Sequence, residues 1–379
     1  LSQMERIHAA DQILSEPTSE MVAAIEAFDP AREAVVVSTF LSTATQLVGR
    51  PMVSSRRPEW LALEDKVVVD AFWDRAGIER QPSRVVALDQ AGRAASDVDR
   101  GDGTVWAADA REGFHGGATQ TYWVRDNGSR DRALAGLSSV CDSVRVMPFL
   151  EGVPCSIHGV VLPDGVAVLR PVEMVTLRRG HVFSYAGCAT YWDPDPVARE
   201  QMRIVATRAG DRLREEVDFR GTFTVDGVVS SDGFWPTELN PRFGAGIMTI
   251  ARGAGIPMVL VNDLIVGGHD IGRTALDLEA DVVTHGDARR GGGTWQGGLD
   301  IETELESVPV QYVDGTWSWA RSGGPIDGRV TTGSGFIRCL YDQASTPIGP
   351  STGPRAAAFW QFAATELGTA TAGLTPARA

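Results

Sequence analysis

The residues best suited to chemistry lie close together near position 230. Asp226 stands in one apolar stretch, Glu238 and Asn240 stand in the next, and Arg242 follows. Two carboxylates and an amide oxygen are hard donors, which Mg²⁺ combines with phosphate and water in an octahedral shell. A neighbouring guanidinium adds a planar cation that suits phosphate. This combination could hold a divalent metal against a polyphosphate.

A hairpin would bring these donors to one face of a sheet. The segment 231–233 ends in Asp-Gly, a hairpin signal in which the glycine can take positive φ. A three-residue loop would pair residues 230 and 234. Continuing the antiparallel ladder from that pair places Asp226 directly opposite Glu238 and on the same face.

Two more polar groups follow at the end of the second strand. Asn240 lies two residues after Glu238 and therefore shares its face. Pro241 ends regular pairing, so Arg242 lies at the exit of the strand. The other interpretation of this pattern is an ordinary amphipathic hairpin with a solvated acidic face.

The composition is typical of a soluble globular protein of two or three domains. The chain has 379 residues, of which 43% are hydrophobic and 22% are charged. No apolar run approaches the roughly 20 residues of a membrane helix, and the first residues lack a secretion signal pattern. We therefore expect a cytoplasmic protein with no membrane partner. The net charge of −14 argues against nucleic acid as a partner.

The cysteines and histidines do not indicate a metal or disulfide framework. The six histidines are dispersed, and no Cys-x-x-Cys occurs. Scattered cysteines in such a protein are expected to be reduced thiols. The four positions are Cys141, Cys155, Cys188 and Cys339.

Lys66 is the only lysine, since the remaining 34 of the 35 basic residues are arginine. A compact, flexible ammonium differs from a guanidinium in the way it meets phosphate, which draws attention to this residue. A chance surface lysine is the alternative. Lys66 falls at the start of a predicted helix over 65–77, with Asp65 as the cap and Gly77 as the stop.

The remaining pattern predicts strands and helices in mixed order. A Gly-rich turn separates two strands of a hairpin before position 125, and the strand from Val144 leads into a bend. Predicted helices cover 18–28, 196–217, 257–266 and 355–367; predicted strands include 34–40 (of the parallel-sheet type), 84–88, 104–109, 121–124, 156–162, 165–171 and 334–341. Segments 285–300 and 322–354 are predicted as loops around a few strands, and the chain ends in a tail that we expect to be disordered. The class is α+β.

In this order the motifs resemble the ATP-grasp ligases over roughly residues 60–266. The resemblance implies that Lys66 contacts nucleotide phosphate and that a flexible Gly loop, with Gly113, Gly116 and Gly117, closes over the β- and γ-phosphates. It also implies a hinge strand over 146–152. There Met147, Phe149, Leu150 and Glu151 contact ATP, the carbonyl of Met147 or Pro148 accepts from the adenine amino group, and the Leu150 N–H donates to the ring.

The same resemblance assigns roles to the hairpin. It makes Asp226, Glu238 and Asn240 ligands of Mg²⁺, for which Mn²⁺ can substitute. Arg242 becomes the catalytic cation on the transferred phosphoryl group, and Gly244 and Gly246 lie near the acyl phosphate. Backbone N–H groups of a Gly-rich turn, metal and arginine stabilise such charge on general grounds.

Two positions depart from the family pattern. The family usually has a second lysine five residues before the first glycine of the loop, where this chain has Ala108. It often has an acid two residues after the hinge glycine, where this chain has Pro154. Either Arg111 or another arginine replaces the lysine, or Lys66 carries more of the phosphate contact. If neither holds, the protein is a weak enzyme.

The resemblance implies an ATP-grasp fold, in which two α+β subdomains grip ATP. We expect a small N-terminal α/β domain over 1–64, subdomain A with the Gly loop over 65–145, subdomain B with the hinge and Mg²⁺ site over 146–266, and a substrate-shaping region over 267–379. The implied activity joins a carboxylate to an amine, such as an amino acid or peptide, through an acyl phosphate. Other ATP-grasp chemistry, including a kinase, and a nucleotide-binding protein without turnover are the alternatives.

Three arginines are candidates for binding the substrate. Arg178 and Arg179 follow a strand after the hinge, and a solvated turn is their alternative. Arg289, before a run of glycines, could belong to a mobile anion-binding lid, with a plain exposed loop as the alternative. The expected partners are small molecules, and a homodimer is left open.

Overall fold

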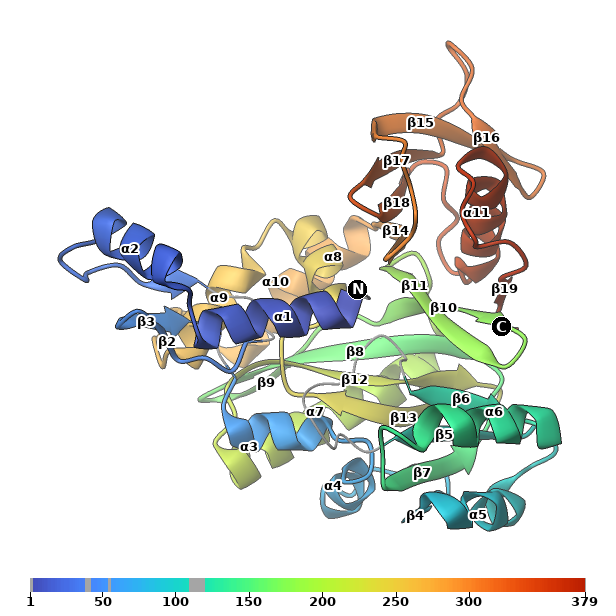
Figure 1. Ribbon diagram of the computed structural model, residues 1–379, viewed down its shortest axis with the longest axis horizontal. Helices are drawn as coiled ribbons and strands as arrows, with labels where there is room; N and C mark the ends of the chain where they lie inside the picture. Colours follow the sequence, from blue (N-terminus) through green and yellow to red (C-terminus); the bar gives the residue numbers. More distant parts are fainter. Residues whose placement is uncertain (1–2, 38–41, 54–55, 109–119, 379) are drawn as a thin grey trace.

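The computed structural model describes residues 3–37, 42–53, 56–108 and 120–378. A large antiparallel sheet runs through the molecule (Figure 1). The N-terminal segment projects from one side of it, and the C-terminal segment rises at the upper right of the view. Antiparallel hairpins packed with helices form α+β architecture, as the sequence predicts.

The N-terminal segment is a small unit of helices and short strands. Thr18 caps its second helix by accepting a hydrogen bond from the Met21 N–H, which confirms the helix predicted there. The strand predicted from Ala34 is two residues long in the described part, and it pairs in parallel as expected. The elements are α1 (Gln3–Ser15), α2 (Ser19–Phe28), β1 (Val36–Val37), β2 (Gln46–Leu47), β3 (Arg50–Val53), α3 (Pro58–Leu61) and η1 (Ala62–Glu64), with the strand order β1-β3-β2.

The next segment is a small sheet covered by two helices. Its strands lie in the order β4-β7-β5-β6, and β6 joins the large sheet by pairing with β11. The elements are α4 (Val69–Arg75), β4 (Arg84–Ala87), η2 (Leu88–Gln90), α5 (Ala91–Val98), β5 (Thr104–Ala108), β6 (Thr121–Val124), α6 (Asn127–Leu137) and β7 (Ser143–Pro148). All of the strands predicted in this segment are present in its described residues.

The helix predicted over 65–77 begins later than expected. Asp65 does not cap it; its carboxylate accepts from the Val67 N–H and holds a turn instead. The helix α4 starts at Val69, so Lys66 lies in the turn before it. Gly77 does take the positive φ of a helix stop, at 63°.

The central segment forms the middle of the large sheet. Asp195 caps its long helix and Pro196 occupies the first turn, so this helix spans the predicted residues. One face of the helix packs Met202, Ala206 and Leu213 against Phe223 and its neighbours on the sheet. The elements are β8 (Val153–Leu162), β9 (Gly165–Val168), β10 (Val172–Arg179), β11 (Val182–Ala189), α7 (Pro196–Val217), β12 (Gly221–Ser230) and β13 (Gly233–Asn240), in the sheet order β13-β12-β8-β10-β11.

The C-terminal segment contains more regular structure than the sequence predicts. The expected loop over 285–300 is the end of one helix followed by a sheet strand, and the tail forms a short strand that pairs with β10 at Leu177 and Arg178. The strands continue the large sheet beyond β11. The elements are α8 (Ala245–Ala254), α9 (Met258–Val266), α10 (Ala275–Ala288), β14 (Gly292–Gly297), β15 (Leu305–Val313), β16 (Thr316–Trp319), β17 (Gly328–Gly333), β18 (Phe336–Tyr341), α11 (Gly353–Glu366) and β19 (Thr375–Pro376).

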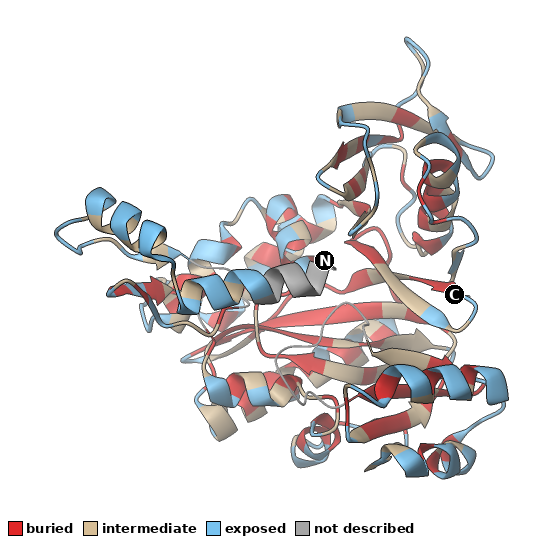
Figure 2. Ribbon diagram, viewed as in Figure 1, coloured by how far each residue is buried: buried red, intermediate tan, exposed pale blue. Residues whose placement is uncertain are grey.

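Buried residues follow the sheet from the central segment into the C-terminal one (Figure 2). The buried carboxylate of Glu173 on β10 fixes the start of α11. It accepts from the Thr352 N–H at 2.7 Å, from the Thr352 hydroxyl at 2.7 Å and from the Gly353 N–H at 3.2 Å. These bonds satisfy donors that the first turn of a helix otherwise leaves unpaired.

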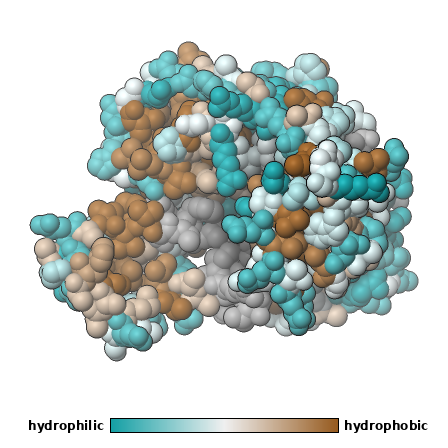
Figure 3. Space-filling view, turned by 90° about the horizontal axis from the view of Figure 1, so that it is seen from above, coloured by the Kyte–Doolittle hydropathy of each residue, from teal (hydrophilic) through white to brown (hydrophobic). Residues whose placement is uncertain are grey.

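An apolar groove lies where the N-terminal segment meets α8 and α9. Figure 3 shows apolar side chains on the lobe at lower left, which the N-terminal segment forms. Val37, Met248, Val259 and Leu260 are exposed in or beside this groove. Within the described residues, no single helix is long and apolar enough to span a membrane, and α8 with α9 meets the length and composition test only as a pair bent by 117°.

Candidate functional site

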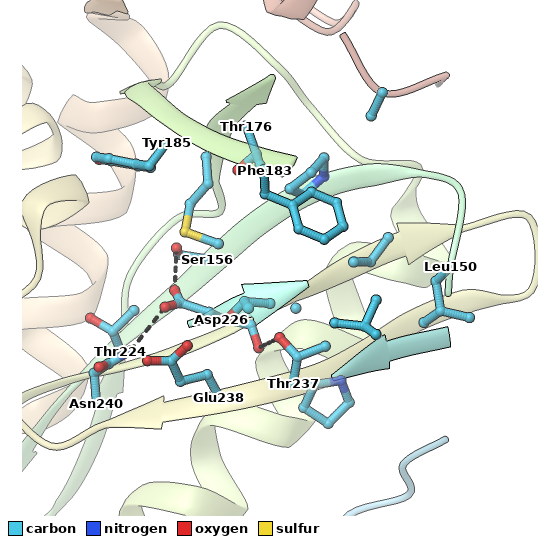
Figure 4. A pocket seen from close by; sticks show the side chains of 18 of the residues that line it. Leu150, Ser156, Thr176, Phe183, Tyr185, Thr224, Asp226, Thr237, Glu238 and Asn240 are labelled. Atoms are coloured by element: carbon cyan, nitrogen blue, oxygen red, sulfur yellow. Dashed lines mark hydrogen bonds between the residues drawn. The ribbon is translucent and has the colours of Figure 1, made fainter. Parts of the chain in front are cut away.

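The β12–β13 hairpin brings the predicted metal ligands together. Asp226 faces Glu238, and Thr224 faces Asn240, as the sequence predicts. On the other side of β12, Ser156 of β8 also faces Asp226. In Figure 4 the side chains of Asp226, Glu238 and Asn240 lie close together on one side of the sheet.

The predicted turn is wrong although the predicted facing pair is right. Ser230 pairs with Gly233, so the loop has two residues and not three. A β-bulge between Asp226 and Gly227 then shifts the register by one residue, which restores the predicted pair Asp226–Glu238. Gly233 accommodates the tight turn at a φ of 116°.

The Asp226 carboxylate is anchored but lacks a full counter-charge. It accepts from the Ser156 hydroxyl at 2.6 Å and from the Asn240 Nδ2 at 2.8 Å. Burial raises the pKa of Asp226 to about 7, and the negative charge of Glu238 adds to the rise. The Ser156 hydrogen bond, Arg242 and Lys66 oppose it. Two carboxylates held together in this way fit a cation placed between them.

The Asn240 amide presents its nitrogen to Asp226 and its oxygen to Arg242. The Arg242 Nη2 donates to the Asn240 Oδ1 at 3.0 Å. Asn240 therefore has to turn its amide by half a rotation to offer oxygen to a metal beside Asp226. The described residues contain no cluster of three or more His, Cys, Asp or Glu side chains that could hold a metal. Two carboxylates and this amide instead form a partial set of the kind that Mg²⁺ completes with phosphate and water.

Arg242 is held from behind by a buried carboxylate. Its Nε lies 3.2 Å from the Glu64 Oε1, and Glu64 also pairs with the Arg56 Nη1 at 2.6 Å. Burial lowers the pKa of Arg56, with Glu64 opposing the shift. This network fixes the guanidinium of Arg242 beside Asn240, where the sequence places a cation.

Lys66 is not a surface lysine. It is buried, and its Nζ lies 3.6 Å from the Glu238 Oε1. The turn before α4 therefore brings an ammonium to the β12–β13 hairpin from the neighbouring segment.

A cavity of about 730 Å³ extends from these residues to the predicted hinge, a volume typical of small-molecule and cofactor sites. Leu150 lies at the end of the pocket remote from Asn240 in Figure 4. The Phe149 ring stacks on Trp123 with centroids 4.0 Å apart, and Phe183 lies parallel to Phe149 at 6.4 Å. The Leu150 N–H has no acceptor among the described residues. Met147 and Glu151 also line this cavity.

The three arginines predicted to bind the substrate lie in different places. Arg178 lines the cavity at its hinge end, where it forms two hydrogen bonds of 3.0 and 2.9 Å with Glu151. Arg179 is exposed and donates to the Ala370 carbonyl, and Arg289 is exposed at the end of α10. Neither lines the cavity. Arg290, next to Arg289, is buried against Asp193 and belongs to no lid.

Gly244 and Gly246 begin helix α8 at the wall of the cavity. A side chain at Gly244 would clash with the Thr224 hydroxyl, and one at Gly246 would clash with the His158 Nε2. His158 is fully buried beside Thr224, with 2.8 Å between its Nδ1 and the hydroxyl, and burial lowers its pKa to about 3. Glycine at these positions lets the helix start close to the sheet, with a neutral imidazole beneath it.

The cavity contains a cation that the sequence analysis did not single out. Ala108 points into the hydrophobic core, whereas its neighbour Ala107 lines the cavity. The residue that faces Ala107 on β7 is Arg145, which lines the same cavity. The sequence feature that could have indicated Arg145 is an arginine within an otherwise apolar strand. Gly113, Gly116, Gly117 and Arg111 lie outside the described residues.

Pro154, where the family often has a ribose-binding acid, lines the cavity on β8.

The sequence matches no protein-family model and no curated protein. Several solved structures are nevertheless similar to the chain. One is a biotin carboxylase from Campylobacter jejuni solved with β,γ-ATP, at 15% identity and a TM-score of 0.55, covering 94% of this chain and 79% of that one.

Two further similar structures were solved with nucleotide. One is an N5-carboxyaminoimidazole synthase from Aspergillus clavatus with ADP and its ribonucleotide, at 10% identity and a TM-score of 0.52, covering 78% of this chain and 73% of that one. The other is the biotin carboxylase domain of a Hydrogenobacter thermophilus 2-oxoglutarate carboxylase with MgADP and bicarbonate, at 14% identity and a TM-score of 0.50, covering 83% and 68%. These proteins are ATP-grasp enzymes.

The chain has the ATP-grasp fold. At these sequence identities, the substrates and products of those proteins cannot be assigned to this one. The cavity of the ATP-grasp chain is lined by both the small sheet (β5, β7) and the central strands (β8, β12, β13), and β14 adds Trp295 and Gln296.

Proposed function

We propose that the protein is an ATP-dependent ligase that joins a carboxylate to an amine. The carboxylate oxygen attacks the γ-phosphorus of ATP, and ADP leaves. The amine nitrogen then attacks the carbonyl carbon of the acyl phosphate, phosphate leaves, and an amide remains. The observation that carries the proposal is the convergence of Asp226, Glu238, Arg242 and Lys66 at one end of a cavity that ends in a hinge.

The hairpin is the part of the proposal that would hold the metal. Asp226, Glu238 and, after an amide rotation, Asn240 would bind Mg²⁺, and Mn²⁺ would substitute for it. The metal would neutralise charge on the β- and γ-phosphates. Its binding supplies the positive charge that the raised pKa of Asp226 indicates is lacking.

The cations and the hinge would position ATP. Lys66 approaches Glu238 from the side of the small sheet, and Arg242 stands beyond Asn240, so they flank the hairpin. A fixed cation near a transferring phosphoryl group stabilises its charge without reorganisation. At the other end, the stacked rings of Trp123 and Phe149 offer an apolar wall, and the Leu150 N–H offers a donor to adenine.

Activation of a carboxylate toward a product other than an amide is the second candidate. The similar structures include carboxylases, one of them solved with bicarbonate. The metal hairpin would serve both reactions equally. An ATP-grasp protein that binds nucleotide without turnover is the third alternative, because strand β5 carries no cation at Ala107 or Ala108.

ADP release separates these alternatives. The purified protein is mixed with Mg²⁺, ATP and pooled amino acids and peptides, and ADP and phosphate are measured. We expect both to be released, with a new amide found by mass spectrometry, and Glu238→Ala to lose this activity while keeping its circular dichroism spectrum. ADP release with bicarbonate alone favours the second candidate. Binding of Mg·ATP with no release under any condition rejects the enzyme, and near-normal activity of Glu238→Ala rejects the metal site.

A further inference from the structure

The cavity contains a buried arginine on strand β7 that neither the motifs nor the family pattern assigns. Arg145 is 2% exposed and still lines the cavity. Its neighbours in the strand, Val144 and Val146, point into the hydrophobic core beneath α5 and α6. The alternation of the strand therefore turns Arg145, and Met147 after it, toward the ligand side.

The register places this cation opposite the position where strand β5 lacks one. Ala107 pairs with Arg145, and Val105 pairs with Met147; all four residues line the cavity. Directly opposed residues of an antiparallel pair share one face, with Cβ atoms about 5 Å apart. A long side chain at Arg145 can therefore reach the volume that a lysine at Ala107 would occupy.

The guanidinium is fixed in place but retains an unused donor. Its Nη2 lies 2.6 Å from the Asp70 Oδ1, and its Nη1 donates to the Thr237 carbonyl at 2.7 Å. Thr237 directly precedes Glu238, so these contacts tie the small sheet to the metal hairpin. The buried Nε–H has no acceptor among the described residues. The Nε–H groups of Arg338 and Arg355 also lack an acceptor among the described residues, but those two side chains do not line the cavity. Arg145 does line it, so its free donor lies where a ligand could supply the acceptor.

We propose that Arg145 is a phosphate-binding residue that replaces, from the neighbouring strand, the cation absent from β5. The inference rests on the proposed nucleotide site. Its Nε–H would donate to a phosphate oxygen of the nucleotide, while Asp70 and Thr237 hold the guanidinium in position. Arg145 would bind a nucleoside polyphosphate. Of the parts of a nucleotide, only the phosphates carry negative charge that a third cation, beside Lys66 and Arg242, could neutralise.

A series of nucleotides tests the role by calorimetry. ATP, ADP, AMP and adenosine are titrated with Mg²⁺ into the wild-type protein and into Arg145→Met. A charge-assisted hydrogen bond corresponds to a loss of about 10- to 100-fold in affinity. We expect that loss for the phosphorylated ligands that reach Arg145 and no change for adenosine. An equal loss for all four ligands, or no loss for any, contradicts the proposal.

Two further variants keep the test independent of folding. Asp70→Met/Arg145→Met removes both charges of the buried pair, a replacement that proteins often tolerate. It should bind adenosine normally and ATP weakly. Adding Ala107→Lys to this double variant returns a cation to β5, and we expect it to recover most of the lost ATP affinity. Failure to recover, in a protein that still binds adenosine, contradicts the replacement.

Arg355 provides the matched control. It is also a buried, ion-paired arginine, with its Nη2 3.8 Å from the Asp327 Oδ1, but it lies in the C-terminal segment and does not line the cavity. Arg355→Met should leave the affinity for every nucleotide unchanged. If the wild-type protein itself binds no Mg·ATP, the proposed function fails; if it binds and Arg145→Met binds equally well, only this inference fails.

Discussion

At the scale of single residues, the site is arranged around a facing pair of acids. Asp226 and Glu238 face each other across the hairpin; Lys66 pairs with Glu238, whereas Arg242 pairs with Glu64 behind it. Burial and the charge of Glu238 raise the pKa of Asp226 to about 7. Between about pH 4 and pH 7, the metal-free folded protein therefore keeps a proton on Asp226 that the unfolded chain, with an aspartate pKa near 4, has already released.

The variant Asp226→Asn tests this charge arrangement. Because the folded pKa is raised, the folded state binds more protons between about pH 4 and pH 7, and its stability falls as the pH rises through this window. The amide removes that dependence. We expect the variant to melt at a higher temperature than the wild type at pH 8 without metal, and the difference to vanish below pH 4.

The control for Asp226→Asn is metal binding itself. Because Mg²⁺ displaces the proton on Asp226, its affinity for the wild-type protein should rise between pH 6 and pH 8, and the variant should lose binding at both values. Calorimetry measures the Mg²⁺ affinity at each pH. A wild-type Mg²⁺ affinity that is the same at pH 6 and pH 8 would contradict a raised pKa of Asp226.

At the scale of elements, a short strand near the end of the chain supports the hinge. β19 pairs with β10 beside Arg178, whose Nη2 donates to the Pro376 carbonyl at 3.0 Å. The Arg378 N–H donates to the Glu151 Oε1 at 2.7 Å, and Ala377 lines the cavity. The strand and Arg378 after it thus fix Arg178 and Glu151 at the hinge end of the cavity, through contacts that span 198 and 227 residues of sequence.

Removal of residues 372–379 tests the role of this strand. The loss of β19 frees Arg178 and Glu151, so we expect the affinity for adenosine and for ADP to fall about tenfold, in proportion to one or two lost positioning contacts. Calorimetry with both ligands measures this. The matched control is Arg378→Ala, which keeps the backbone N–H to Glu151 and should bind like the wild type. An unchanged affinity after truncation would mean that the hinge is held without β19.

Local signals explain which elements could be predicted. Helix α7 matches its prediction because Asp195, Pro196 and the apolar face are all read within the helix. Helix α4 was predicted too early because Asp65 makes a turn and not a cap. Helix α10 was missed, although Thr274 and Asp277 form a capping box that could be read from the sequence.

At the scale of the whole molecule, the ATP-grasp fold brings together residues that no local pattern connects. The β12–β13 hairpin could be predicted because Asp226 and Glu238 lie on adjacent strands with a turn signal between them. Arg145 could not, because its role depends on the pairing of β5 with β7 and on the approach of Thr237 from β13. The arginines at 179 and 289 are exposed outside the cavity, which agrees with the alternatives of a solvated turn and an exposed loop, and only the tertiary structure shows this.

The position of a bound metal decides whether the β12–β13 hairpin is the metal site. Crystals grown with Mn²⁺ and ADP would give an anomalous difference map at the manganese absorption edge. We expect one peak between the Asp226 and Glu238 carboxylates, with the adenine at Leu150 and the phosphates between Lys66 and Arg242. A peak elsewhere, or nucleotide bound outside this cavity, would contradict this expectation.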